Sequence, residues 1–117
     1  MAIDLFGPVV RNVARNGDSV EVVLFVPGDL IYFRGHFPDA PILPGVVQLD
    51  WAYRQACVHF ELESEPSMEV QIKFRQVITP ESEVVLTMRF DGMMRRLAFA
   101  YKSAAGGEHS SGQLKFR

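Results

Sequence analysis

Three groups within residues 36–50 could together move protons on a substrate that contains a carbonyl group. His36 is a candidate general base, because histidine titrates near neutral pH. Asp50 is a candidate general acid, and Gly45 with Val46 could donate backbone N–H groups to a carbonyl oxygen that gains negative charge. The simpler interpretation of His36 is an ordinary surface histidine.

The loop that carries His36 is stiff. Between its two bounding glycines, residues 35–45 contain Pro38, Pro41 and Pro44. Proline fixes the backbone angle φ and is excluded from the interior of a helix, so this loop can hold a side chain at a fixed angle. A helix that begins directly after Pro44 would leave its first N–H groups without partners inside the helix.

Helical periodicity predicts one long helix from about Gly45 to Phe60. Its apolar arc contains Val46, Leu49, Tyr53, Ala56, Cys57 and Phe60, and Val47, Trp51 and Val58 extend this arc round the side. The clear polar face is limited to Gln48, Gln55 and His59. We expect a helix this apolar to be mostly enclosed by the rest of the protein.

Asp50 interrupts this apolar arc, because it projects between Val46 and Cys57. A carboxylate in such a place loses hydration unless it is paired, hydrogen-bonded or protonated, and a partly buried carboxyl suits a general acid. The alternative is an ion pair with Arg54, one turn further along the helix. Periodicity alone leaves both interpretations open.

Alternation of apolar and polar residues, together with turn signals, predicts about six strands. The clearest run is 68–76, with Met68, Val70, Ile72 and Phe74 facing inward. A second strand spans 83–90 with Val84, Leu86, Met88 and Phe90 inward, and a third passes through Leu97, Phe99 and Tyr101. Residues 107–117 could add a last strand with Leu114 and Phe116 inward, in which Gly112 suggests a bulge. Residues 9–14 and 19–26 are expected to form a hairpin.

These elements predict an α+β architecture in which a curled antiparallel sheet wraps one helix. The chain of 117 residues is 48% hydrophobic and 22% charged, so we expect a single domain over residues 1–117 with one core. Cys57 is the only cysteine, which excludes a disulfide within the chain. We interpret it as a small buried residue rather than a reactive thiol.

Charge and hydropathy exclude several classes of partner. The net charge of -2 argues against a general nucleic-acid binder. No apolar run reaches the length of a membrane-spanning helix, so no membrane partner is expected. The first ten residues include Asp4 and lack the features of a secretory signal, which predicts a cytoplasmic protein.

A continuous motif runs through the loop and into the helix: Tyr32-Phe33-Arg34-Gly35-His36-Phe37-Pro38, then Pro41, Pro44-Gly45-Val46 and Asp50. It closely resembles the signature of the 3-hydroxyacyl-[acyl carrier protein] dehydratases, above all the bacterial fatty acid dehydratases, including those called hydroxymyristoyl dehydratases. The similarity continues in Lys73-Phe74-Arg75 and in the Thr79-Pro80-Glu81 turn, so it covers most of the chain. The resemblance implies a hotdog fold, with a sheet of about six strands around one long central helix.

The resemblance also implies a role for each candidate residue. His36 would remove the proton α to a thioester, and Asp50 would protonate the departing β-hydroxyl. The amide of Gly45, with Val46 beside it, would hold the thioester carbonyl. The reaction would need no cofactor and no metal, and its product would be a trans-2-enoyl thioester. In the family the base and the acid of one site come from opposite protomers, which predicts a homodimer or a higher oligomer.

Several alternatives remain open beside this interpretation. The acid is Asp50, whereas the commonest dehydratase branch has Glu, and the branch that also isomerises the double bond has Asp. The pathway could be fatty acid or polyene or polyketide-like biosynthesis. A hotdog acyl thioesterase would use its carboxylate to activate water, although the loop around His36 argues against it. The chain could also be a non-catalytic subunit of a complex with another hotdog protein.

The resemblance implies that the substrate is carried by an acyl carrier protein through a phosphopantetheine arm. Carriers of this kind are acidic, so binding requires a local cationic patch on this slightly acidic chain. Arg34 adjoins the loop, and Lys73 and Arg75 share the outer face of their predicted strand. These three residues are the candidates for docking the carrier. The alternative is that they simply form a solvated surface.

Overall fold

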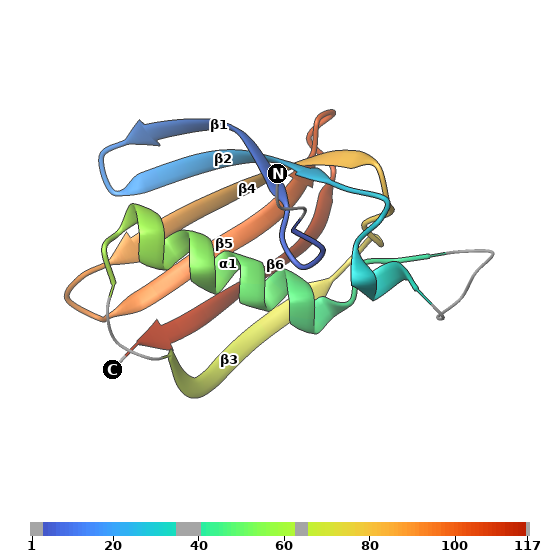
Figure 1. Cartoon of the computed structure of the whole chain (residues 1–117). Coiled ribbons are helices and arrows are strands. Elements are labelled where there is room, and N and C mark those ends of the chain that lie inside the picture. The colour runs from blue at the N-terminus through green and yellow to red at the C-terminus, as the bar shows by residue number, and fades with distance from the viewer. Residues whose placement is uncertain (1–3, 35–40, 63–65, 117) are drawn as a thin grey trace.

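The computed structural model describes residues 4–34, 41–62 and 66–116. They form one long helix, one short 3-10 helix and six strands (Figure 1). In chain order these are β1 (Val9–Asn16), β2 (Ser19–Val26), η1 (Ile31–Phe33), α1 (Gly45–His59), β3 (Pro66–Phe74), β4 (Ser82–Asp91), β5 (Arg96–Ser103) and β6 (Glu108–Phe116). The predicted helix and strands are thereby confirmed, with ends that differ by a few residues.

All six strands belong to one antiparallel sheet with the order β1-β2-β4-β5-β6-β3. The predicted hairpin is β1 with β2, and Gly17 turns it with a positive φ of 62°, where glycine has no steric penalty. β3 follows α1 in the chain and returns to the far edge of the sheet, beside β6. The edges of the sheet are therefore β1 and β3.

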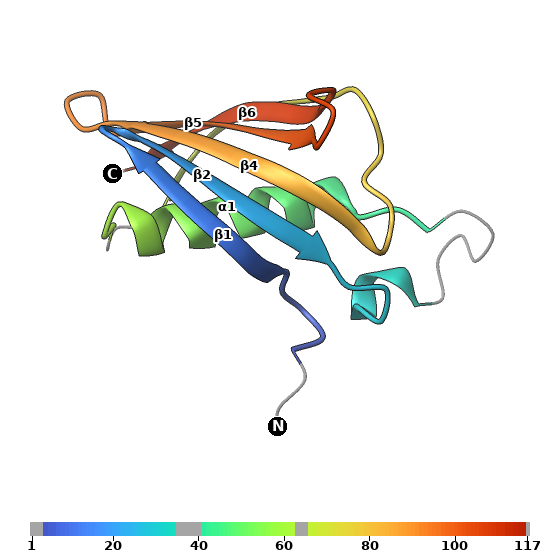
Figure 2. The same ribbon diagram turned by 90° about the horizontal axis from the view of Figure 1, so that it is seen from above.

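Helix α1 crosses one face of the curved sheet, as Figure 2 shows from above. The core lies between them, where Trp51, Ala52 and Ala56 are buried against strand residues such as Leu86 and Tyr101. The inward residues predicted for β4, β5 and β6 are buried or packed against this core. The predicted α+β architecture is confirmed. No helix in the described part of the chain has the length and apolar character needed to cross a membrane.

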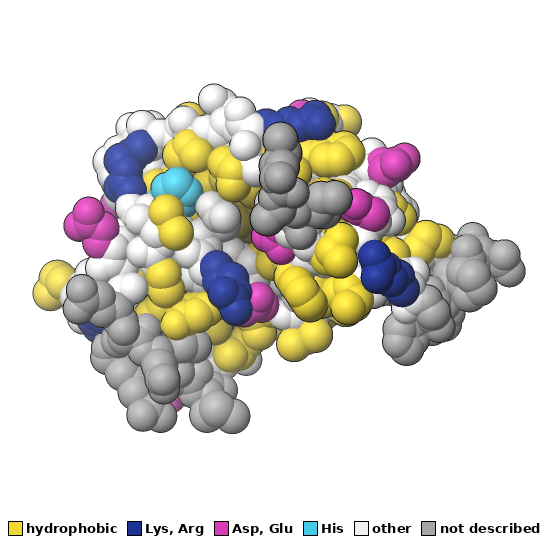
Figure 3. All heavy atoms as spheres, in the orientation of Figure 1, with side chains coloured by type: hydrophobic (Ala, Val, Ile, Leu, Met, Phe, Trp, Pro, Cys, Tyr) yellow, Lys and Arg dark blue, Asp and Glu magenta, His cyan; other side chains and the backbone are white. Residues whose placement is uncertain are grey.

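The predicted faces of α1 are partly wrong. Periodicity predicts Gln48 on the polar face, but it is buried, whereas Val46 and Val58 of the predicted apolar arc are 73% and 67% exposed. The sheet covers one side of α1, and the other described residues leave much of its far side exposed, so within the described part of the chain the helix is not mostly enclosed. Figure 3 shows hydrophobic side chains exposed on the face of the molecule that carries α1.

Strand β3 also departs from its prediction. Val70 and Phe74 pair with Leu114 and Ser110 of β6, both of which are buried, so they lie on the helix side of the sheet. They are nevertheless 38% and 55% exposed, because β3 is an edge strand and no strand of the described residues pairs with its outer side. The alternation of apolar and polar residues predicted the correct face of the sheet for Val70 and Phe74, but it did not predict that they are exposed there.

The bulge suggested at Gly112 is not there. Gly112 pairs in regular register with Ile72 on one side and Phe99 on the other, and the register shift of β6 lies at residues 108–110. A Cβ atom at position 112 would collide with the backbone oxygen of Gln71. Gly112 is therefore required for the close approach of β3 to β6 rather than for a bulge.

Candidate functional site

The first turn of α1 supplies backbone donors. Pro44 caps the helix in an extended conformation, with φ −61° and ψ 149°. The carbonyl oxygen of Pro44 accepts hydrogen bonds from the N–H groups of Val47 and Gln48, at 3.1 and 3.2 Å. The N–H groups of Gly45 and Val46 precede these donors and have no acceptor within the helix. The helix start therefore carries the donors that the sequence predicts at these two residues.

Gly45, one of these two residues, borders a hollow of about 280 Å³ beside the start of α1. Its wall includes Ile42, Gly45, Gln48, Phe74 and Val77. The ring of Phe74 lies directly against Gly45, so that a Cβ atom at position 45 would collide with it. Glycine is thus the residue that lets the aromatic ring approach the helix start. The hollow therefore lies beside one of the two predicted donors.

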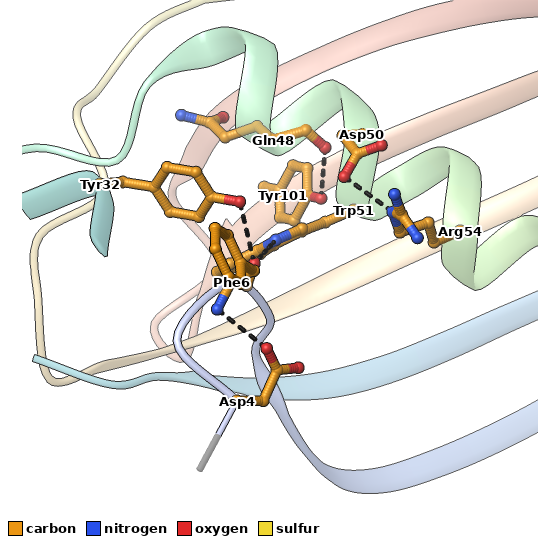
Figure 4. Close-up of polar contacts among 8 residues, drawn as sticks. All are labelled: Asp4, Phe6, Tyr32, Gln48, Asp50, Trp51, Arg54 and Tyr101. Carbon is orange, nitrogen blue, oxygen red and sulfur yellow. Dashed lines mark hydrogen bonds and ion pairs between the residues drawn. The ribbon is translucent and has the colours of Figure 1, made fainter. Parts of the chain in front are cut away.

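Asp50 lies one turn further along α1 and is ion-paired. Its Oδ2 accepts a hydrogen bond of 2.9 Å from Nε of Arg54, and the two side chains are 43% and 72% exposed respectively (Figure 4). The ion pair that the sequence left as an alternative is therefore present. The carboxylate is half-buried, which leaves it accessible to a ligand or a second protomer.

Asp50 borders a second hollow, of about 500 Å³, between α1 and the N-terminal segment. The carbonyl oxygen of Phe6 accepts hydrogen bonds from the hydroxyl of Tyr32 at 3.2 Å and from Nε1 of Trp51 at 3.0 Å (Figure 4). Burial, and secondly the charge of Asp50, raise the pKa of the Tyr32 hydroxyl, so it remains a donor at neutral pH. Sequence reasoning did not predict that the N-terminal segment lines this hollow.

Gly45 and Asp50 lie on different sides of α1. Five residues along a helix correspond to a rotation of about 140°. The hollow at Gly45 and the hollow at Asp50 accordingly share no lining residue. Within one chain, Gly45 and the carboxylate of Asp50 therefore border different hollows.

His36 lies outside the described residues, so its position relative to Asp50 is not given by the structure. Arg34 follows η1 and is exposed. Lys73 is exposed near the end of β3, and Arg75 lies one residue beyond that strand. Nε of Arg75 donates a 2.7 Å hydrogen bond to Glu108, so a neighbouring carboxylate offsets its charge. Arg34 and Lys73 form no ion pair with another described residue.

A buried hydrogen-bond network that the sequence did not predict holds the start of α1. Nε2 of Gln48 donates to the carbonyl oxygen of Leu43 at 3.1 Å, and Oε1 of Gln48 accepts from the hydroxyl of Ser110 at 2.7 Å. The backbone oxygen of Gln48 accepts from the hydroxyl of Tyr101 at 2.6 Å (Figure 4). Burial, and secondly the charge of Asp50, raise the pKa of Tyr101 well above its ordinary value, so this hydroxyl stays protonated.

Two further candidate features concern Cys57 and metal binding. Cys57 is half-buried and packs against the core, close to its predicted environment. Within residues 4–34, 41–62 and 66–116, no three His, Cys, Asp or Glu side chains lie close enough together to hold a metal ion. Of the predicted catalytic and thioester-binding residues, the structure describes Gly45, Val46 and Asp50.

Comparisons with known proteins agree with the motif. Residues 12–113 match the profile of the family described as ApeI-like, ApeI dehydratase. The 3-hydroxyacyl-[acyl-carrier-protein] dehydratase FabZ of Legionella pneumophila is 35% identical in an alignment of length 75 that covers 55% of this chain and 49% of that protein. The protein of the same name from Streptococcus equi subsp. zooepidemicus is 28% identical over 70% of this chain and 64% of its own length. The chain therefore spans about half to two thirds of these curated relatives.

Solved structures show the same fold over nearly the whole chain. A chain of the dehydratase heterocomplex ApeI:P from Xenorhabdus doucetiae superposes with a TM-score of 0.85 at 27% identity, covering 93% of this chain and 96% of that one. An uncharacterised protein from Erwinia carotovora subsp. atroseptica gives a TM-score of 0.73 at 31% identity, with coverage of 95% and 94%. The predicted hotdog fold is confirmed. Since the family match extends over most of the chain, this protein belongs to the ApeI-like dehydratase family.

Proposed function

We propose that this chain is a 3-hydroxyacyl-[acyl carrier protein] dehydratase, which removes water from a 3-hydroxyacyl thioester and leaves the trans-2-enoyl thioester. The observation that carries the proposal is the family match over residues 12–113, which contains the whole motif from Tyr32 to Asp50. Curated relatives that bear the name of this activity support it. The acyl chain would belong to fatty acid or polyene or polyketide-like biosynthesis.

In the proposed reaction His36 takes the proton from the carbon next to the thioester carbonyl. The electron pair left on that carbon forms the new double bond as the β-hydroxyl departs. Asp50 gives its proton to this hydroxyl, which leaves as water. The N–H groups of Gly45 and Val46 stabilise the negative charge that develops on the thioester oxygen. Proton transfer and hydrogen bonding are sufficient for these steps, so the proposal includes no cofactor.

The ion pair of Asp50 with Arg54 bears on this mechanism. A general acid must carry a proton, whereas an ion-paired carboxylate is charged. Both side chains are substantially exposed, and such a pair contributes at most about 1 kcal/mol to stability. The pair can therefore open at small cost when a substrate or a second protomer covers Asp50.

The proposed active unit is a dimer or a higher oligomer, with the base and the acid of one site on opposite protomers. Two observations support a shared site. Gly45 and Asp50 border separate hollows on different sides of α1. The edge strand β3 leaves Val70 and Phe74 partly uncovered, as expected of a surface that a second chain covers. Because a related solved structure is a heterocomplex, another hotdog subunit is a candidate partner beside a second copy.

The proposed carrier is an acyl carrier protein, and Arg34 and Lys73 are its proposed docking residues. Both side chains are exposed, and neither is ion-paired with another described residue. Arg75 is a weaker candidate, because Glu108 already offsets its charge. An acidic carrier surface and the phosphate of its arm would pair with such cations.

The experiment is an intact-mass measurement on carrier proteins loaded with 3-hydroxyacyl chains of graded length. A dehydratase removes the mass of one water and leaves the thioester in place. A thioesterase removes the whole acyl group and leaves the unloaded carrier. A non-catalytic subunit changes neither alone but raises the activity of its partner, so the assay is repeated with a second hotdog chain. A carrier that keeps its mass at every chain length, with and without that chain, contradicts the proposal.

A further inference from the structure

The first turn of α1 is tied to the rest of the protein by a single buried amide. Gln48 is 3% exposed, and its side chain bonds the carbonyl oxygen of Leu43 in the preceding loop and the hydroxyl of Ser110 in β6. Its backbone oxygen accepts a hydrogen bond from the hydroxyl of Tyr101 in β5. One residue thus joins the loop, the helix and two central strands.

This arrangement is unusual within the core. Apart from the hydroxyl of Tyr101 and the indole N–H of Trp51, Gln48 and Ser110 carry the buried polar side-chain groups of the described residues, and they bond each other. A buried amide costs free energy unless each of its polar atoms is paired, and an apolar side chain of the same size would fill the space without that cost. A fully paired buried network chiefly fixes the relative position of the elements that it joins.

The network fixes the part of the helix that carries the proposed oxyanion donors. Gln48 borders the hollow at Gly45, and its backbone N–H bonds the oxygen of Pro44. Its side chain meanwhile holds the oxygen of Leu43, the residue before Pro44. Both bonds act on the segment 43–45, which sets the direction of the Gly45 N–H group. The loop is held from its other side by the 2.8 Å bond from the N–H of Leu43 to the oxygen of Ile78.

We infer that Gln48 is a positioning residue, which uses Ser110 and Leu43 to hold the Gly45 amide at a fixed angle to the hollow, and with it the first turn that carries the Val46 amide. This inference rests on the proposed function. Displacement of a donor by about 1 Å lowers turnover by up to about 10²-fold, because the developing charge no longer meets its hydrogen bond. Loss of the network should therefore lower kcat rather than merely raise KM.

The test compares Gln48→Met with Val20→Ala. Methionine keeps the length of the side chain and removes its hydrogen bonds, whereas Val20→Ala creates a cavity in the core at the start of β2, opposite Met88. Both variants should lower Tm. Only Gln48→Met should lower kcat, by about tenfold or more, with a smaller change in KM. Ser110→Ala should show the same pattern more weakly, and it replaces Gln48→Met if that variant does not fold.

Hydrogen exchange provides a second readout that does not depend on activity. The amides of residues 45–48 should exchange faster in Gln48→Met than in Val20→Ala when each variant is measured at the same interval below its own Tm. If the wild type is inactive, the proposed function fails while exchange still decides whether Gln48 orders the helix start. If the wild type is active and Gln48→Met keeps its kcat, or loses no more than Val20→Ala does, the inference is overturned.

Discussion

The carboxylate of Asp50 and the guanidinium of Arg54 form an ion pair across one turn of α1, with 2.9 Å between Oδ2 and Nε. Comparing variants of the two partners can distinguish a structural role of Asp50 from a catalytic role. If Asp50 served only the ion pair, removing either partner would have the same small effect.

We therefore expect different results for Asp50→Asn and Arg54→Gln. Asp50→Asn should lower turnover by at least about 10²-fold, because it removes the proton donor and keeps the shape of the side chain. Arg54→Gln should change the free energy of unfolding by less than about 1 kcal/mol and leave turnover close to the wild type. Steady-state kinetics and thermal unfolding of both variants check this. Equal kinetic losses in the two variants would assign Asp50 to the ion pair alone.

The shared site is tested by mixing two inactive variants. In a mixed dimer of His36→Ala with Asp50→Asn, one site loses both groups and the other keeps both. Random exchange of subunits should then restore up to about a quarter of the wild-type activity. The measurement is activity after co-refolding, with mixed dimers verified by native mass spectrometry. Mixed dimers without activity would show that base and acid come from the same protomer.

Carrier docking is tested by reversing single charges. Arg34→Glu and Lys73→Glu should raise KM for carrier-bound substrate, and the rise should shrink with added salt, because exposed charges chiefly affect association. Arg75→Glu should have a smaller effect, since Glu108 already offsets that charge. Turnover of a small pantetheine thioester is the control and should barely change. Equal losses on both substrates would mean that these residues support the site itself.

Gly112 and Gly92 form a matched pair for the fold. A Cβ atom at position 112 would meet the backbone oxygen of Gln71, whereas nothing lies within 4 Å of the corresponding position at Gly92. Gly112→Ala should lower the free energy of unfolding by about 1–3 kcal/mol, because a backbone oxygen inside a sheet cannot easily move away. Gly92→Ala should leave it nearly unchanged. Denaturant titration compares the two, and a neutral Gly112→Ala would contradict the close approach of β3 to β6.

The sequence correctly predicted the helix and strands in which buried residues recur at a regular interval. Leu86 and Met88 alternate with polar residues because one face of β4 meets the helix, and Pro44 with Gly45 marks the start of α1. Gln48 was placed on the wrong face because its type indicates exposure, while its actual environment depends on Ser110, which is distant in sequence. An arc centred on Trp51 and Ala52 would have included it.

The exposure of Val46 and the role of Gly112 depend on neighbours that are distant in sequence, and periodicity contains no information about such neighbours. Val46 belongs to the apolar arc yet lies on the uncovered side of α1. Gly112 carries the same local signal whether a strand bulges or another backbone approaches closely. The ion pair of Asp50 with Arg54 follows from their spacing, and the motif around it predicted the family that the comparisons confirm.

The most direct measurement is the intact mass of a 3-hydroxyacyl carrier protein after incubation with the wild type, His36→Ala, Asp50→Asn and Arg54→Gln under identical conditions. The proposed function predicts that the wild type and Arg54→Gln remove the mass of one water and keep the thioester. It predicts that His36→Ala and Asp50→Asn leave the carrier unchanged on the same time scale. Water loss that persists in Asp50→Asn, or release of the whole acyl group by the wild type, would contradict the proposed dehydratase mechanism.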